Sequence, residues 1–166
     1  IVVMIEGRGL GRRNKAFFND KNIKFPDGKN QLDRIAVIKR LAQQYPYMDL
    51  NRVGVGEMPS SCAAFNGLLG HPDFYKVGVA HNAMSNLRCI SSFYADEVSR
   101  ERFDSCVIKK SLEDYVGNLS GKLLLMHGMM DGTIPVAGTF RLIQALENAN
   151  KDFDMMLLPE DGHDLP

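Results

Sequence analysis

Three segments of the chain carry side chains suited to hydrolytic chemistry. Two serines, Ser60 and Ser61, follow a short apolar stretch that is rich in small residues. Asp131 follows a second apolar stretch, and His163 follows a third one near the end of the chain. A serine hydroxyl becomes a nucleophile when a histidine accepts its proton, and a carboxylate can hold that imidazole in the required tautomer. The order serine, aspartate, histidine therefore indicates a triad-type hydrolytic site.

Each of these residues also has an ordinary structural interpretation. Single aspartates and histidines occur in the surface loops of most proteins, so His163 is equally well explained as a solvated loop histidine. Cys62 follows the two serines and is a second type of nucleophile. A small cysteine at the start of a helix, however, more often belongs to the core. Spacing alone leaves these alternatives open.

The segments between these residues alternate between strand and helix patterns. Continuous apolar stretches predict strands over residues 1–5, 52–55, 75–80, 122–126 and 152–158. Apolar residues at three-to-four-residue spacing predict helices over 31–44, with Asn30 as its N-cap, and over 136–148. A further helix is expected to begin in the small-residue segment 59–64 and to end near Gly70. Strands that alternate with helices of this length form a mostly parallel sheet, which is typical of the α/β class.

A sheet of this kind carries helices on both faces, so its strands are buried. We therefore expect Met155 and Met156, which lie inside the last apolar stretch, to belong to the core. Ligands of such sheets bind beyond the carboxyl ends of the strands. Because the two serines, Asp131 and His163 all follow predicted strands, we expect them to lie at one edge of the sheet.

Composition argues against several classes of protein. The 166 residues contain 20 Lys and Arg and 20 Asp and Glu, and this zero net charge argues against a nucleic-acid partner bound through bulk charge. No apolar stretch reaches the roughly 18 residues of a membrane-spanning helix. The three cysteines, at 62, 89 and 106, are too few for a disulfide scaffold. The chain opens on an apolar stretch and closes without a polar tail, so we expect one domain, 1–166, that is truncated at both ends.

Longer motifs along the chain are more specific than single residues. They are Glu6-Gly7-Arg8-Gly9, Asn51-Arg52-Val53-Gly54-Val55, the segment from His71-Pro72-Asp73 to Ala80, Gly121-Lys122-Leu123-Leu124-Leu125-Met126-His127-Gly128, and Asn150-Lys151-Asp152-Phe153-Asp154. Together they resemble the catalytic domain of the prolyl oligopeptidase family of serine peptidases, most closely its dipeptidyl peptidase IV-like branch. The resemblance covers nearly the whole chain.

This resemblance implies an α/β-hydrolase fold, which in the family is usually joined to a β-propeller. It also implies the hydrolysis of short peptides without a metal or a cofactor. The acid position of the family's triad corresponds to Asp131 and the base position to His163. Gly132 stands where the family usually has a second aspartate. Arg88 and Tyr94 match substrate-binding positions of the family, although a surface ion pair and a structural tyrosine are the simpler explanations.

The nucleophile position departs from the family's Gly-x-Ser-x-Gly-Gly pattern. Counting forward from the preceding strand motif puts the serine position at Pro59, and counting back from the following motif puts it at Met58. Neither residue is a serine. We therefore predict that the nucleophile is replaced and that the chain is a degenerate, inactive homologue.

Two alternatives stay open. The first is an active serine hydrolase that uses the shifted Ser60 or Ser61; Ser61 is sterically the better of the two because Pro59 and Ala63 occupy the positions two residues away. The second is a non-catalytic module that binds a peptide or a protein partner, or that forms a homodimer through an edge of the sheet.

Overall fold

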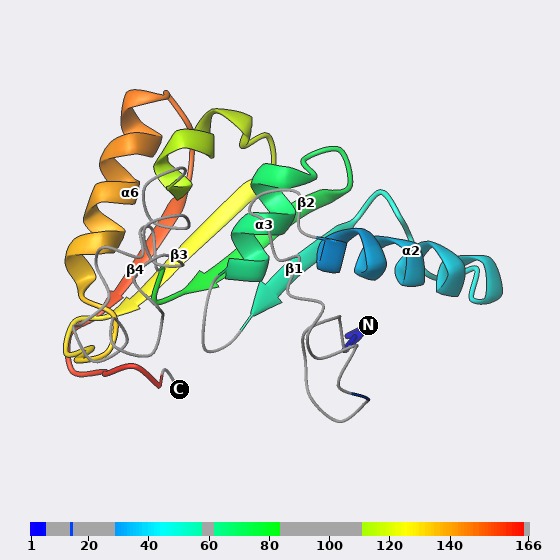
Figure 1. Ribbon diagram of the computed structural model, residues 1–166, viewed down its shortest axis with the longest axis horizontal. Helices are drawn as coiled ribbons and strands as arrows, with labels where there is room; N and C mark the ends of the chain where they lie inside the picture. Colours follow the sequence, from blue (N-terminus) through cyan, green and yellow to red (C-terminus); the bar gives the residue numbers. More distant parts are fainter. Residues whose placement is uncertain (6–13, 15–28, 58–61, 84–110, 165–166) are drawn as a thin grey trace.

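The computed structural model describes residues 1–5, 14, 29–57, 62–83 and 111–164 (Figure 1). Its helices are α2 (Lys29–Gln44), α3 (Cys62–Gly70) and α6 (Val136–Asn148), and a 3-10 helix, η2, spans Leu112–Asn118. Its strands are β1 (Val53–Glu57), β2 (Tyr75–His81), β3 (Lys122–Gly128) and β4 (Asp154–Leu158). The strands and helices predicted within this part of the chain beyond residue 30 are confirmed, with small differences at their ends. None of the described helices is long and apolar enough to cross a membrane.

The four strands form one parallel sheet in the order β1-β2-β3-β4. Helix α3 connects β1 to β2, and α6 connects β3 to β4, so both pairs are βαβ units. Figure 1 shows the arrowheads of all four strands pointing to the same side. The segments that follow the strands therefore leave the sheet at one edge, where the sequence predicts a binding site.

The core lies between the sheet and helices α3 and α6. Phe65 and Leu68 of α3 are buried, and so are Ala64 and Leu69, so this helix is enclosed on more than one face. Leu142 and Leu146 of α6, which lie about one turn apart, are fully buried as well. A side chain at Gly78 of β2 would overlap the side chain of Leu68, so this glycine lets α3 pack directly on the strand.

A buried hydrogen bond connects α2 to the sheet. The hydroxyl of Tyr75, at the start of β2, donates to the side-chain oxygen of Gln31 at 3.1 Å. Both side chains are buried, and burial raises the pKa of the Tyr75 hydroxyl. The hydrogen bond satisfies two polar groups that water does not reach, and it fixes the first turn of α2 against β2.

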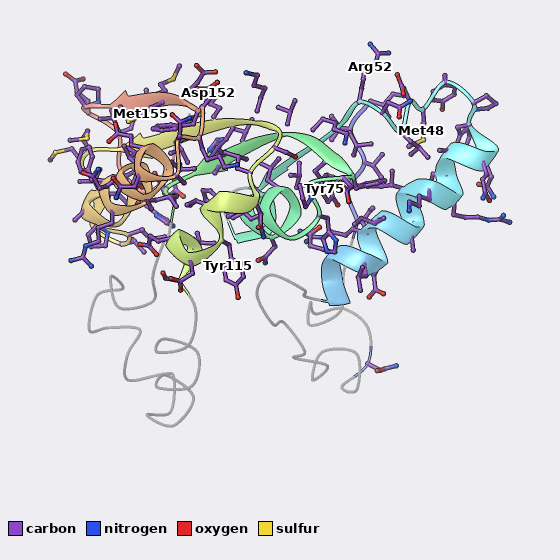
Figure 2. All side chains as sticks on the ribbon, turned by 90° about the horizontal axis from the view of Figure 1, so that it is seen from above. Met48, Arg52, Tyr75, Tyr115, Asp152 and Met155 are labelled. Carbon is purple, nitrogen blue, oxygen red and sulfur yellow. The ribbon has the colours of Figure 1, made fainter. Side chains whose placement is uncertain are left out.

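Helices α3 and α6 and the 3-10 helix η2 lie on one face of the sheet, below the strands in Figure 2, and α2 lies to the side, beyond β1. Val77 of β2 and Met155 and Met156 of β4 are each 47% exposed. The prediction that the two methionines belong to the core is wrong. The physical reason for their exposure is that β4 is the last strand of the described sheet and that the described helices cover one face of that sheet.

Two local predictions at the start of the chain are also wrong. Residues 1–5 do not form a strand, and Ile1, Val2 and Met4 are exposed. An apolar segment becomes a strand only when a neighbouring strand pairs with its backbone. The residue types of the segment itself do not show whether such a neighbour is present. Asn30 is not the N-cap of α2, because the helix already begins at Lys29.

Candidate active site

Backbone hydrogen bonds join the two loops that carry the predicted acid and base. The N–H of Met129, just after β3, donates to the carbonyl of Leu158 at the end of β4, at 2.9 Å. The N–H of Met130 donates to the carbonyl of Asp161, also at 2.9 Å. These bonds continue the pairing of β3 with β4 beyond the sheet. The two loops are therefore held side by side.

Asp131 and His163 meet between these loops. The imidazole Nδ1 of His163 lies 2.9 Å from Oδ2 of Asp131. The side chain of Asp131 is fully buried, whereas that of His163 is 26% exposed. The structure thus brings together the two residues that the sequence predicts as acid and base. The carboxylate is shielded from water, and the imidazole stays partly exposed.

The second carboxylate oxygen of Asp131 is held by the loop that follows it. Its Oδ1 accepts the backbone N–H groups of Thr133 at 2.7 Å and of Ile134 at 2.8 Å. Burial by itself would raise the pKa of Asp131, but the N–H of Ile134, the bond to His163 and the N–H of Thr133 outweigh it. Together they lower the pKa of this carboxyl below its ordinary value, so Asp131 is ionised at neutral pH.

The ionised carboxylate determines which nitrogen of His163 carries a proton in the neutral ring. A carboxylate only accepts hydrogen bonds, so Nδ1 must donate to Oδ2 of Asp131. The other ring nitrogen, Nε2, then has a free lone pair. This is the tautomer in which a histidine accepts a proton from a nucleophile.

A second histidine, His127, supports the same loop from inside the core. Its ring is fully buried; Nε2 lies 3.0 Å from the carbonyl of Ile134, and Nδ1 lies 2.7 Å from the hydroxyl of Thr139. Because a carbonyl only accepts, Nε2 carries the proton and the Thr139 hydroxyl donates to Nδ1. Burial lowers the pKa of His127, which keeps the ring neutral. His127 thus anchors the loop after Asp131.

The end of β3 needs a glycine. A Cβ atom at Gly128 would collide with the carbonyls of Gly162 and Asp161, the two residues before His163. The absence of a side chain therefore lets the His163 loop approach the strand closely. Sequence reasoning singled out neither His127 nor Gly128 as a site residue. The signal available was their position directly after an apolar strand, at the edge where ligands bind.

Four candidate site residues, Ser60, Ser61, Arg88 and Tyr94, lie outside the described residues, as do Met58 and Pro59. Strand β1 ends at Glu57 and α3 begins at Cys62, so residues 58–61 connect a strand to a helix at the carboxyl end of β1. In the described part of the chain, no group of three or more His, Cys, Asp and Glu side chains is arranged to hold a metal ion.

A family model described as the prolyl oligopeptidase family matches residues 1–166. The chain belongs to the prolyl oligopeptidase family. The α/β-hydrolase fold expected from the sequence is thereby confirmed by the family and by the parallel sheet with its helices. Among curated relatives, the chain is 26% identical over 177 residues to dipeptidyl peptidase 8 of Mus musculus and 27% identical over 172 residues to dipeptidyl peptidase family member 1 of Caenorhabditis elegans.

The match covers 99% of this chain but 19% and 21% of those two relatives, so the chain spans about a fifth of their length. Among solved structures, Porphyromonas gingivalis dipeptidyl peptidase 4 matches 95% of this chain with a TM-score of 0.78 and 25% identity, and the match covers 23% of that protein. An acylaminoacyl peptidase in complex with a chloromethyl ketone has a TM-score of 0.73 at 19% identity over 95% of this chain and 27% of its own. That second likeness concerns the fold alone.

Proposed function

We propose that this chain is a serine-type hydrolase domain that cleaves peptide bonds, with His163 as the general base and Asp131 as the residue that orients it. The observation that carries the proposal is the 2.9 Å contact between His163 Nδ1 and the buried Asp131 carboxylate. A buried ionised carboxylate is costly unless it is well hydrogen-bonded, and here it accepts three N–H groups. That arrangement supports the proposal that the imidazole of His163 is fixed in the tautomer whose Nε2 can accept a proton.

The proposed reaction follows from this pair. A serine hydroxyl attacks the carbonyl carbon of a peptide bond, and its proton passes to Nε2 of His163. Asp131 stabilises the positively charged imidazolium. The imidazolium then gives the proton to the departing amine, which leaves an acyl-enzyme. A water molecule repeats the sequence and releases the acid.

The sequence predicts a replaced nucleophile, but the contact between Asp131 and His163 favours the alternative with a shifted serine. We favour Ser61 as that nucleophile and Ser60 as the second choice. In hydrolases of this fold the nucleophile occupies the sharp turn between a strand and a helix. Residues 58–61 make up that connection, and Ser61 directly precedes α3. The backbone N–H of Cys62, at the start of α3, would then donate to the oxyanion, because the residue after the nucleophile supplies one donor of the hole.

The proposed substrates are short peptides. This part of the proposal rests on family membership and on relatives named dipeptidyl peptidases. The same resemblance is the basis for proposing Arg88 and Tyr94 as substrate-binding residues.

Fluorophosphonate labelling tests the proposal, because this reagent reacts covalently with an activated serine. The labelled residue would be located by mass spectrometry in the folded chain and in four variants: Ser61→Ala, Ser60→Ala, Asp131→Asn and the control Ser120→Ala, which changes an exposed serine. We expect the label on Ser61, its loss in Ser61→Ala and in Asp131→Asn, and full labelling of Ser120→Ala. If both Ser61→Ala and Ser60→Ala are still labelled in full, neither serine is the nucleophile and the assignment is rejected.

A second candidate function is peptide binding without hydrolysis. The specific observation in its favour is that the family's serine position falls on Met58 or Pro59 in this chain. The same labelling experiment separates the two candidates. A folded chain that takes up no fluorophosphonate, yet binds a Pro-containing tripeptide in a calorimetric titration, would support the binding module and reject the hydrolase.

A further inference from the structure

Asn82 directly follows β2 and makes three hydrogen bonds to other segments. Its backbone N–H donates to the carbonyl of Met126 in β3 at 2.7 Å. Its side-chain Oδ1 accepts the N–H of Gly128 at the end of β3, at 3.1 Å. Its side-chain Nδ2 donates to the backbone carbonyl of His163, at 2.5 Å. One buried side chain thus connects the ends of β2 and β3 to the loop of the proposed base.

The chemistry of this contact requires an amide. One bond needs an acceptor for the N–H of Gly128, and the other needs a donor for the carbonyl of His163. An ionised carboxylate can only accept, and an apolar side chain would leave both backbone groups without these partners. Asn82 is 0% exposed, so water does not replace either bond.

The backbone of Asn82 is also unusual. Its φ of 45° lies in the left-handed region, which non-glycine residues rarely adopt and in which asparagine is one of the better tolerated. A strained conformation of this kind persists only where surrounding contacts hold it. Here the three hydrogen bonds supply those contacts.

We propose that Asn82 is a positioning residue for His163. His163 itself is held at two points, through its ring by Asp131 and through its main-chain carbonyl by Asn82. If the amide releases the carbonyl, the loop turns more freely and the ring leaves the carboxylate for part of the time. The ring itself is partly exposed, so solvent can compete for Nδ1 once the loop moves.

The test observes the His163–Asp131 bond directly. The proton on Nδ1 of His163 has its own NMR resonance, which can be assigned by its loss in His163→Gln. Asn82→Gly removes the amide and keeps the backbone conformation accessible, because glycine adopts positive φ without strain. The matched control is Asn150→Gly, at the other non-glycine residue with positive φ in the described part of the chain, 52°, which follows α6 at the opposite end of the sheet.

We expect the resonance in the wild-type chain and in Asn150→Gly, and its loss, or proton exchange with water at least ten times faster, in Asn82→Gly. Asn82→Asp should behave like Asn82→Gly, because it keeps the acceptor for Gly128 and lacks the donor for His163. An unchanged resonance in either folded variant would overturn the inference, as would its absence from the wild-type chain. Failure of both variants to fold would overturn it too, since Asn82 would then serve folding and not positioning.

The consequence for turnover rests on the proposed function. If the chain hydrolyses peptides, Asn82→Gly should lower kcat at least tenfold and leave KM unchanged, because substrate contacts stay in place while the base is misaligned. A wild-type chain without hydrolytic activity would contradict the proposed function, while the NMR resonance would still decide the role of Asn82.

Discussion

Oδ2 of Asp131 and Nδ1 of His163 lie 2.9 Å apart, although 32 residues separate them in the chain. Asp131 lies in the loop after β3 and His163 in the loop after β4, and these two strands are neighbours in the sheet. Their parallel pairing carries both residues to the same edge. The contact between these two side chains is thus a direct result of strand order.

Replacing Asp131 by asparagine should abolish most of the proposed activity. The amide could donate to Nδ1 of His163, which would move the ring proton to Nε2 and remove the lone pair that accepts the serine proton. The same change in a well-studied serine peptidase lowers kcat about 10,000-fold. We expect a loss of about 1,000- to 10,000-fold in kcat on a dipeptide amide. Asp152→Asn, which changes an exposed carboxylate, is the control; equal kcat values for the two variants would contradict the assignment.

Gly128→Ala should displace the His163 loop. The new Cβ would collide with the carbonyls of Asp161 and Gly162, and such overpacking typically destabilises a protein by about 1–3 kcal/mol. Urea denaturation would measure this loss, and the Nδ1–H resonance of His163 would report the displacement. Gly132→Ala is the matched control because its Cβ meets nothing within 4 Å. Similar stability changes in both variants would argue against close packing at Gly128.

The stability of the chain should decrease as pH falls below about 6.5, the ordinary pKa of histidine. Burial lowers the pKa of His127 in the folded state, so the unfolded chain binds this proton first as pH falls. Neutral His127 makes its full contribution to the free energy of unfolding above the pKa that it has in the unfolded chain. As pH falls from that value toward the lower pKa of the folded chain, this contribution is lost, with a limiting slope of about 1.4 kcal/mol per pH unit. Asp131 titrates below this range, because its own pKa is lowered from the usual carboxyl value.

Urea denaturation at pH 7.5 and at pH 5.5 measures this effect of His127. The free energy of unfolding should be smaller at pH 5.5 in the wild-type chain, and the difference should shrink in His127→Asn, which has no titratable ring. A difference that is the same in both chains would show that the pH dependence comes from other groups.

Tyr75→Phe should destabilise the fold without touching the site. It leaves the buried oxygen of Gln31 without the Tyr75 hydroxyl, a loss of about 1–2 kcal/mol in the free energy of unfolding. Tyr47→Phe removes an exposed hydroxyl and should change stability by less than about 0.5 kcal/mol. Thermal or urea unfolding compares the two, and equal losses would mean that the Tyr75–Gln31 bond adds little.

Much of the fold could be predicted from local sequence. The continuous apolar stretches around Val77 and Leu124 predict strands, because a parallel strand is buried on both faces. The apolar residues of 136–148 repeat with a period of about 3.6 residues and predict a helix. Asp131 and His163 could be selected because both follow such strands. Met155 and Met156 could not be placed correctly, since their burial depends on which faces of the sheet other elements cover.

The contacts of Asn82, His127 and Gly128 depend on the folded chain. Nothing in the neighbourhood of Asn82 in the sequence indicates that its amide reaches the carbonyl of a residue 81 positions later. Residue type and periodicity depend on neighbours along the chain, and they account for the elements and the chemical groups available. Distances between loops depend on strand order, register and the close approach that a glycine allows, and these arise only when the whole sheet has packed.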